Sequence, residues 1–361
     1  MTLGYRKWTL TGAIAAIVLV IWLIQRGTVM PPPLISDADI PLATPVPDKE
    51  SRYARAKELV GVGEFINSPP FALADFIGEK VILIDFWTYS CINCQRTQPY
   101  LNDWWSKYKD DGLLIVGVHT PEFEFEKDPM NVRKAVAQAG IGYPVVQDND
   151  YQTWRAYRNQ YWPRKYLIDA DGYIVYDHIG EGAYEETERK IQELLIELAG
   201  RRGTDADAVT SDMGTPEGAV EVEYTRVGTP EIYLGAWRNE QYLGNAATGT
   251  EGLQSPAMPG DDARKANLVY LGGRWDFAYE YVRCVSDCVL RIRYTARQVN
   301  IVAGAPGSRD ITVLRDGAEW GSVRVSDETL YTVVDDPEGY GTHELELRIP
   351  AGLDLFTFTF G

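Results

Sequence analysis

Two cysteines, Cys91 and Cys94, stand in the stretch FWTYSCINCQRTQPY at residues 86–100. Their spacing suits a redox-active dithiol, half of a metal site, or a structural disulfide. A closed zinc site needs a complete set of Cys or His ligands at recognisable spacing. The histidines of this chain do not follow the cysteines in a Cys-x-x-Cys…His-x-x-x-His pattern. The sequence therefore argues against structural zinc and predicts neither a metal nor a cofactor.

Thiol–disulfide exchange is the chemistry that the remaining pattern favours. Such exchange requires a thiolate, whereas an ordinary cysteine thiol is mostly protonated at neutral pH. Cys91 begins a predicted helix, where unpaired backbone N–H groups and the helix dipole stabilise an anion. We therefore expect Cys91 to be the nucleophile. Cys94, one turn further along, is then the resolving thiol that attacks the mixed disulfide and releases the reduced substrate.

The bulk composition narrows the class of protein. The chain has 361 residues, of which 45% are apolar and 24% charged, as in globular proteins with room for two domains. Its formal net charge is −17. Because nucleic-acid binding needs a basic surface that neutralises phosphates, we expect no nucleic-acid partner.

An uncharged stretch near the N-terminus predicts a membrane anchor. Residues 8–24 read WTLTGAIAAIVLVIWLI, with Arg6 and Lys7 before them and Arg26 after them. No cleavage site of small residues follows, which favours an uncleaved signal anchor over a cleaved signal peptide. The excess of positive charge before the span predicts a cytoplasmic N-terminus. The bulk of the chain would then lie outside the cytoplasm, on the periplasmic or outer face of the cell membrane, where disulfides persist.

Changes in composition divide the chain into five predicted segments. Residues 1–30 form the N-tail and transmembrane signal anchor, and residues 31–53 form a Pro-rich spacer. Residues 54–200 alternate between strand and helix patterns, residues 201–219 read as a polar linker, and residues 220–361 carry short strands and turns.

The first folded segment has the order of a βαβ unit followed by a ββα unit. Continuous apolar runs predict buried strands, and amphipathic runs that end at glycine predict helices. Asp171–Gly172 marks the turn of a hairpin. The predicted elements are strands at 80–87, 113–120 and 143–148, helices at 91–112, 128–140 and 183–200, and a hairpin at 164–182.

Several marks in this segment together resemble the thioredoxins. Asp85 precedes the cysteine pair in IDFWTYSCINC, Pro99 follows it, and Pro163 stands before the returning strand in YWPRKYLIDADG. These phrases, with GVHTPEFEFEKD, closely resemble the TlpA-like and DipZ-type membrane-anchored redoxins. The resemblance implies an α/β thioredoxin fold with a central mixed sheet and flanking helices. The chain lacks the multi-pass CcdA-like membrane part of DipZ-type proteins, so its electrons would pass through a separate membrane protein.

The resemblance also implies roles for three residues around the cysteines. Asp85 would be a buried proton acceptor for Cys94 with a raised pKa, the alternative being an acid at a strand end that reaches water. Pro163 would follow a cis peptide bond and lie against the cysteine pair; a plain trans turn proline is the alternative. Glu122 is a candidate acid that tunes the cysteines, and a solvated loop carboxylate explains it equally well.

Three aromatic residues are candidates for contact with the substrate. Trp87 and Tyr89 would form an apolar rim around Cys91, although core packing explains Trp87 almost as well. Trp162 stands where thioredoxins usually carry a smaller residue, which predicts different substrate contacts.

The C-terminal segment predicts an all-β domain. Short strand patterns separated by turn residues favour a β-sandwich or jelly roll, which begins with an alternating edge strand at 220–228. The segment resembles carbohydrate-binding modules and the C-terminal domain of DipZ-type proteins. Trp237, Tyr242 and Trp275 would then stack on a glycan, or else pack in the core.

A second cysteine pair lies in the C-terminal segment. Cys284 and Cys288 flank three residues between two strand-like runs, which predicts a structural disulfide across a short hairpin. Because the closed loop is short, it would stabilise the domain only modestly. A second redox pair that communicates with Cys91 and Cys94 is the alternative.

The leading functional hypothesis is a membrane-anchored thiol–disulfide oxidoreductase that reduces disulfides of exported proteins. The resemblance points to cytochrome c maturation or redox repair, with a CcdA-like electron donor. One alternative is a glycan- or protein-binding module with an accessory redox domain. A thiol peroxidase is a further alternative, and Ile84 argues against it because it stands where the peroxidatic motif has proline.

Overall fold

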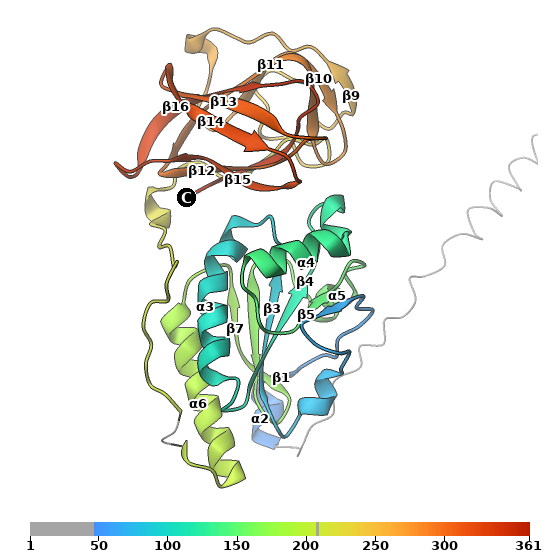
Figure 1. The fold of residues 1–361 in the computed structure, drawn as a ribbon, viewed down its shortest axis with the longest axis vertical. Coiled ribbons are helices and arrows are strands. Elements are labelled where there is room, and N and C mark those ends of the chain that lie inside the picture. Colours follow the sequence, from blue (N-terminus) through green and yellow to red (C-terminus); the bar gives the residue numbers. More distant parts are fainter. Residues whose placement is uncertain (1–46, 207–208) are drawn as a thin grey trace, which may run out of the picture. The chain divides into compact units, whose positions relative to one another are not determined.

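The computed structural model describes residues 47–206 and 209–361 (Figure 1). The predicted membrane anchor at 8–24 and most of the Pro-rich spacer lie outside these residues. Within the two described ranges, no helix is both long enough and apolar enough to cross a membrane.

The first domain is built on a seven-stranded mixed sheet with the order β1-β7-β6-β3-β4-β5-β2. Its central strand β3 (Val81–Trp87) runs parallel to β4 (Leu113–His119) and antiparallel to β6 (Arg164–Ile168). The two inner strands β3 and β4 are buried along their whole length, as their continuous apolar runs predict. The outer strands are β1 (Ala54–Arg55), β2 (Phe65–Ile66), β5 (Val145–Gln147) and β7 (Tyr173–Ile179).

Helices cover both faces of this sheet (Figure 1). Side chains alternate along a strand, so Val81 and Leu83 pack on one face while Ile82 and Ile84 pack on the other. The first face is covered by α3 (Ile92–Tyr108), α4 (Pro129–Gln138) and α6 (Tyr184–Arg202). The second face packs against the short helix η1 (Leu73–Phe76) and, through Trp154, α5 (Gln152–Ala156). Asp85 belongs by alternation to the first face, beneath α3.

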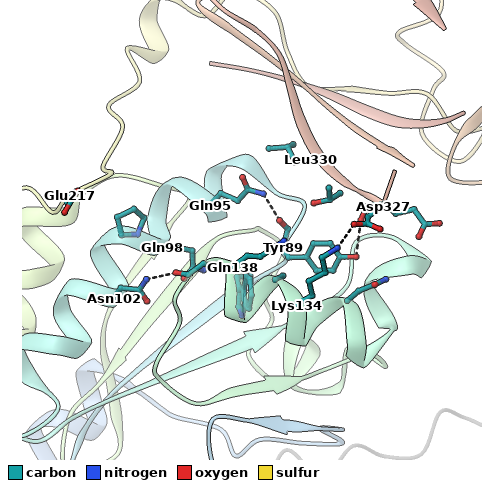
Figure 2. A pocket seen from close by; sticks show the side chains of 16 residues that line it. Tyr89, Gln95, Gln98, Asn102, Lys134, Gln138, Glu217, Asp327 and Leu330 are labelled. Atoms are coloured by element: carbon teal, nitrogen blue, oxygen red, sulfur yellow. Dashed lines mark hydrogen bonds and ion pairs between the residues drawn. The ribbon is translucent and has the colours of Figure 1, made fainter. Parts of the chain in front are cut away.

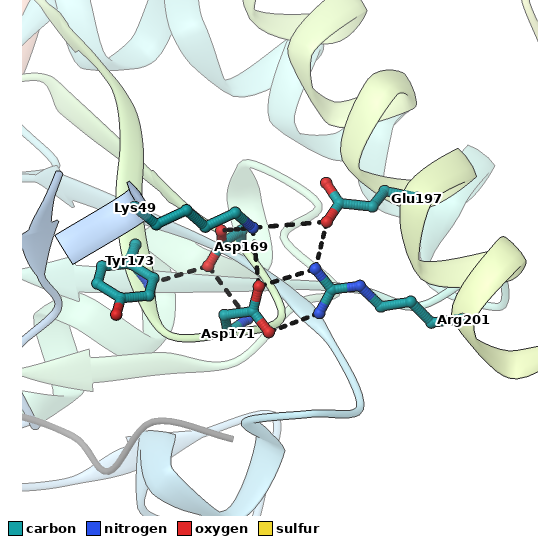
Figure 3. Close-up of polar contacts among 6 residues, drawn as sticks. All are labelled: Lys49, Asp169, Asp171, Tyr173, Glu197 and Arg201. Atoms are coloured by element: carbon teal, nitrogen blue, oxygen red, sulfur yellow. Dashed lines mark hydrogen bonds and ion pairs between the residues drawn. The ribbon is translucent and has the colours of Figure 1, made fainter. Parts of the chain in front are cut away.

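A cluster of ion pairs joins helix α2 (Pro47–Arg52) to the turn between strands β6 and β7 (Figure 3). The ammonium of Lys49 lies 2.7 Å from carboxylate oxygens of both Asp169 and Asp171. The guanidinium of Arg201, in the last turn of α6, pairs with Asp171 at 2.5 Å and also with Glu197. Asp171 is buried, and Arg201 and Lys49 hold the pKa of its carboxyl below its usual range. The cluster therefore fastens the hairpin turn between β6 and β7 to two helices.

The second domain is all-β, with a ten-stranded antiparallel sheet around one apolar core. Hydrogen bonds link all ten strands in a single sheet, rather than the two separate sheets of the predicted sandwich. The strands at the ends of the main order, β14 and β15, also lie close together, so the sheet approaches a barrel. The strands are β8 (Ile232–Tyr233), β9 (Gly252–Gln254), β10 (Val269–Phe277), β11 (Val282–Ala296), β12 (Gln298–Gly304), β13 (Arg309–Arg315), β14 (Ala318–Val325), β15 (Thr329–Asp335), β16 (Gly341–Ile349) and β17 (Asp354–Phe360).

Two local predictions for this domain differ from the structure. The predicted edge strand at 220–228 instead contains the 3-10 helix η4 (Tyr224–Arg226) and precedes the first strand of the domain. Within the part of the chain that the structure describes, no strand pairs with this segment to supply the ladder hydrogen bonds that a strand needs. Cys284 and Cys288 form a disulfide, but both lie within strand β11 rather than across a hairpin. Against β10 the strand carries extra residues at this point, so the disulfide closes a bulge.

Candidate active site

Cys91 occupies the N-cap position of helix α3. Its backbone is extended, and its sulfur accepts a hydrogen bond from the backbone N–H of Cys94 at 3.3 Å. Cys91 is partly exposed whereas Cys94 is fully buried, and both are free cysteines. The Cys91 sulfur therefore lies at the N-terminal end of the helix dipole, where it accepts one of the unpaired backbone N–H groups. The structure thus places one accessible and one enclosed thiol a single turn apart.

A buried acid lies beneath the enclosed thiol. Asp85 is 1% exposed, and neither oxygen of its carboxyl has a hydrogen-bond partner among the described residues. Burial raises the pKa of Asp85 to about 7, against the opposing charge of Lys165. Burial, the neighbouring Cys91 and the charge of Asp85 all raise the pKa of the Cys94 thiol. Because the Asp85 carboxyl is buried, it is not an acid at a strand end that reaches water, which was the alternative.

Lys165 is a site residue that the sequence analysis missed. It lies opposite Asp85 in the register of β3 and β6, and its side chain is completely buried. Its ammonium donates to the backbone oxygen of Gly180 at 3.2 Å, and burial lowers its pKa. In the strand sequence RKYLI, Lys165 alternates with Leu167 and so shares its face of the sheet. A lysine at this position could equally extend its ammonium to water at the edge of the sheet, so the sequence did not indicate burial.

The peptide bond between Trp162 and Pro163 is cis. The backbone oxygen of Trp162 lies 4.0 Å from the Cys91 sulfur. The indole of Trp162 donates to the backbone oxygen of Thr120 at 3.0 Å and packs against Trp154. The turn before β6 therefore lies directly against the accessible thiol, as the resemblance implied.

A second missed residue, Glu126, holds the loop that carries the cysteines. Its carboxyl is completely buried and accepts bonds from the Ser90 hydroxyl at 2.6 Å and the Ser90 N–H at 3.2 Å. It also accepts the backbone N–H groups of Glu122 at 2.6 Å and Phe123 at 3.0 Å. The sequence alternates glutamate with phenylalanine at 122–126, and that alternation does not reveal which glutamate is buried.

Glu122 contacts the second domain. Its carboxylate accepts the hydroxyl of Tyr233 at 2.8 Å and the guanidinium of Arg238 at 3.0 Å. Beside this ion pair, Phe356 of β17 packs on the rings of Phe123 and Phe125, with centroid separations of 5.1 and 4.9 Å. The loop that follows β4 therefore joins the redox domain to the β domain next to the cysteines.

Cys91 opens into a cleft between these two domains with a volume of about 320 Å³. The redox domain contributes Ile92, Asn93, Glu122 and Trp162 to its walls. The β domain contributes Glu231, Tyr233 and Phe360 among others. The accessible thiol is thus reached through a cleft of which one wall belongs to the C-terminal domain.

Trp87 and Tyr89 lie away from this cleft. Both are buried, and both line a separate cleft of about 620 Å³ that also touches Gln98, Lys134 and Asp327 (Figure 2). The Tyr89 hydroxyl lies 3.4 Å from the backbone oxygen of Glu328 in the β domain. Of the three predicted aromatic contacts, the structure brings only Trp162 to the Cys91 cleft.

The candidate sugar-stacking residues are scattered. Trp275 is completely buried in the core of the β domain, and Tyr242 packs against that core. Trp237 is exposed and stacks on Tyr279 with parallel rings 5.5 Å apart. Among the residues that the structure describes, no group of His, Cys, Asp and Glu could hold a metal ion.

Comparisons with known proteins agree with this architecture. Residues 66–177 match the AhpC/TSA family, and residues 229–361 match the family described as a thioredoxin-like C-terminal domain. The chain is 39% identical over 311 residues to Protein DipZ of Mycobacterium bovis, a match that covers 85% of this chain and 43% of DipZ. The chain therefore spans less than half the length of that relative.

A shorter relative is covered almost completely. Thiol-disulfide oxidoreductase YkuV of Bacillus subtilis is 31% identical over 140 residues, which cover 39% of this chain and 93% of YkuV. Among solved structures, a thiol:disulfide interchange protein DsbE from Chlorobium tepidum is 26% identical over 40% of this chain and 96% of its own, with a TM-score of 0.36. With its Cys-x-x-Cys helix start and thioredoxin-like domain, the chain belongs to the family of thioredoxin-like thiol–disulfide oxidoreductases.

Proposed function

We propose that this oxidoreductase works outside the cytoplasm, anchored to the membrane, and reduces disulfides of exported proteins through Cys91 and Cys94. The observation that carries the proposal is the pairing of an accessible N-cap thiol with a buried thiol above Asp85. The uncharged stretch at 8–24 supports the anchored location. The role would be cytochrome c maturation or the repair of oxidised proteins.

The reaction begins when the Cys91 thiolate attacks one sulfur of the substrate disulfide. A mixed disulfide forms, and the other substrate sulfur leaves as a thiolate that takes up a proton. Cys94 must then lose its proton before it can attack the Cys91 sulfur. Asp85 accepts that proton, because a carboxyl with a pKa of about 7 is matched to proton transfer near neutral pH.

The second exchange completes the transfer of two electrons. The Cys94 sulfur bonds to the Cys91 sulfur, the mixed disulfide breaks, and the second substrate thiolate leaves. The enzyme ends with a Cys91–Cys94 disulfide and the substrate as a dithiol. A separate membrane dithiol protein of the CcdA-like kind would return the enzyme to its reduced form.

The direction of electron flow is tested by the reduction potential of the Cys91–Cys94 couple. The full-length chain in detergent is equilibrated with dithiol–disulfide buffers, and its thiols are counted by alkylation and mass spectrometry. A reductant is expected near thioredoxin, at about −270 mV, and a strong oxidant near about −120 mV. A value near the oxidising end would overturn the proposal. Cys91→Ser, which cannot form the couple, is the matched control for the alkylation signal.

A further inference from the structure

The wall that the β domain contributes to the Cys91 cleft is held in place by several contacts. Glu122 binds both Tyr233 and Arg238, and the backbone N–H of Glu124 donates to Glu280 at 2.9 Å. Phe356 fills the apolar contact beside them. Because charged, polar and apolar contacts all lie next to the cleft, a substrate meets both walls together when it reaches Cys91.

The size of the cleft limits what can reach the thiol. At about 320 Å³, its volume lies near the lower end of the range for small-ligand pockets. A disulfide on the rigid surface of a folded protein would bring too much neighbouring structure to enter. A small disulfide, or a cystine in an extended and flexible chain segment, can enter.

The charge of the cleft distinguishes among such substrates. The carboxylates of Glu122 and Glu231 both line it. Arg238 pairs with Glu122, whereas Glu231 has no ion pair within the described residues. Tyr233, between them, contributes a neutral hydroxyl. The cleft beside Cys91 therefore carries an excess of one negative charge when both carboxyls are ionised.

The pKa of Glu231 is consistent with two carboxylates lying close together in the cleft. The residue as a whole is exposed, and it lines the cleft. Burial there, followed by the nearby charge of Glu122, raises its pKa to about 7. A positive charge on a bound substrate would relieve the repulsion between the two carboxylates.

We infer that the cleft selects disulfides that carry positive charge next to the sulfurs, on small or extended molecules, and that Glu231 on the β domain sets this preference. In a polypeptide, this class is a flexible segment with lysine or arginine beside the cysteine. The inference rests on the proposed thiol–disulfide exchange at Cys91 and adds the substrate class. It also gives the C-terminal domain a part in substrate choice.

Three small disulfides of similar size test the inference. Cystamine carries two ammonium groups, hydroxyethyl disulfide is neutral, and dithiodiglycolate carries two carboxylates. Each is reduced by the pre-reduced full-length chain at pH 8, where Glu231 is ionised, and each rate is divided by the rate with dithiothreitol. This division removes differences in intrinsic reactivity. We expect cystamine to react about tenfold faster than dithiodiglycolate, with a preference that shrinks as salt is added.

Variants separate the cleft from the charge of the whole protein. Glu231→Gln should reduce the cation-to-anion ratio about threefold, whereas Glu251→Gln removes the same charge from an exposed position of the same domain and should leave the ratio unchanged. A peptide disulfide flanked by lysine should exceed its glutamate-flanked counterpart in the same way.

The outcomes distinguish failure of the proposed exchange from failure of the substrate preference. If the wild-type chain reduces none of the three disulfides, the proposed exchange itself fails. If it reduces all three with equal normalised rates, the exchange stands and the substrate preference is overturned. Equal ratios in Glu231→Gln and the wild type would overturn the role of Glu231, and a ratio that falls equally in Glu251→Gln would assign the preference to the overall charge. The wild-type ratio alone decides the preference even if Glu231→Gln fails to fold.

Discussion

Asp85 and Lys165 lie opposite each other on strands β3 and β6, and both side chains are buried beside Cys94. Lys165 opposes the rise in the pKa of Asp85 without bonding to its carboxyl, whose oxygens lack a partner among the described residues. Because burial makes the Asp85 carboxyl costly to ionise, the carboxylate is a stronger proton acceptor than an ordinary aspartate and can take the proton of Cys94.

Replacing Asp85 by asparagine should change how stability depends on pH. The pKa of Asp85 rises from 3.8 to about 7 on folding, so the folded state binds the proton more tightly. Its contribution to stability therefore falls as pH rises from about 4 to about 7. Asparagine does not titrate, so the stability of Asp85→Asn relative to the wild type should grow by up to about 4 kcal/mol across that window. Urea unfolding at several pH values measures this; a pH-independent difference would contradict the raised pKa.

Removing the carboxyl of Glu126 should loosen the loop that carries Cys91. Glu126→Ala leaves buried donors of Ser90 and Phe123 and a partly buried donor of Glu122 without an acceptor, which should cost about 3 kcal/mol. Thermal unfolding measures the loss, and alkylation of Cys91 across pH measures any change in its thiolate. Glu124→Ala, which removes an exposed neighbouring carboxyl, is the control. An unfolding midpoint equal to that of the control would refute the positioning role.

Phe356 should fasten the β domain over the cleft. Phe356→Ala removes its contacts with Phe123 and Phe125 and should lower stability by about 3 kcal/mol. Loss of this contact should also let a bulky disulfide reach Cys91 faster, while a small one gains less. Rates with a large and a small disulfide measure the effect. Equal changes for both would show that the β domain does not restrict access.

Arg201 should protect the fold against acid. Arg201 lowers the pKa of Asp171. The pair therefore stabilises the protein at pH values above the ordinary pKa of aspartate. This stabilisation is lost as the pH falls through the lowered pKa of Asp171. Arg201 is partly exposed, so Arg201→Ala should cost about 1 kcal/mol or less at pH 7. The variant should lose less stability on acidification than the wild type. Lys190→Ala, in an exposed pair of the same helix, should leave the acid profile unchanged.

The residues of the redox domain nearest the thiols could be predicted from the sequence because they lie close together along the chain or in recognisable motifs. The spacing of Cys91 and Cys94 at a helix start placed one thiol at the N-cap. The apolar strand around Asp85 indicated burial. The resemblance of YWPRKYLID to thioredoxins, rather than any local pattern, implied a cis bond before Pro163, and that cis bond is present.

The other half depends on contacts between distant segments. Lys165 reaches Asp85 only through the pairing of two strands, and Glu126 is buried by the loop that it organises. Glu231 and Tyr233 approach Cys91 because a second domain packs on the first. The pattern at 220–228 predicted a strand that lacks a partner, and the spacing of Cys284 and Cys288 suggested a hairpin where one strand bulges. Pairing and docking of this kind are not encoded in local periodicity.

Trapping the mixed disulfide tests the central assignment most directly. The full-length chain with Cys94→Ser, and separately with Cys91→Ser, is incubated in reduced form with a peptide disulfide and analysed by intact mass and peptide mapping. The assignment predicts a stable peptide adduct on Cys91 in the Cys94→Ser chain and little adduct in the Cys91→Ser chain. An adduct that forms equally fast on Cys94 when Cys91 is absent would contradict it.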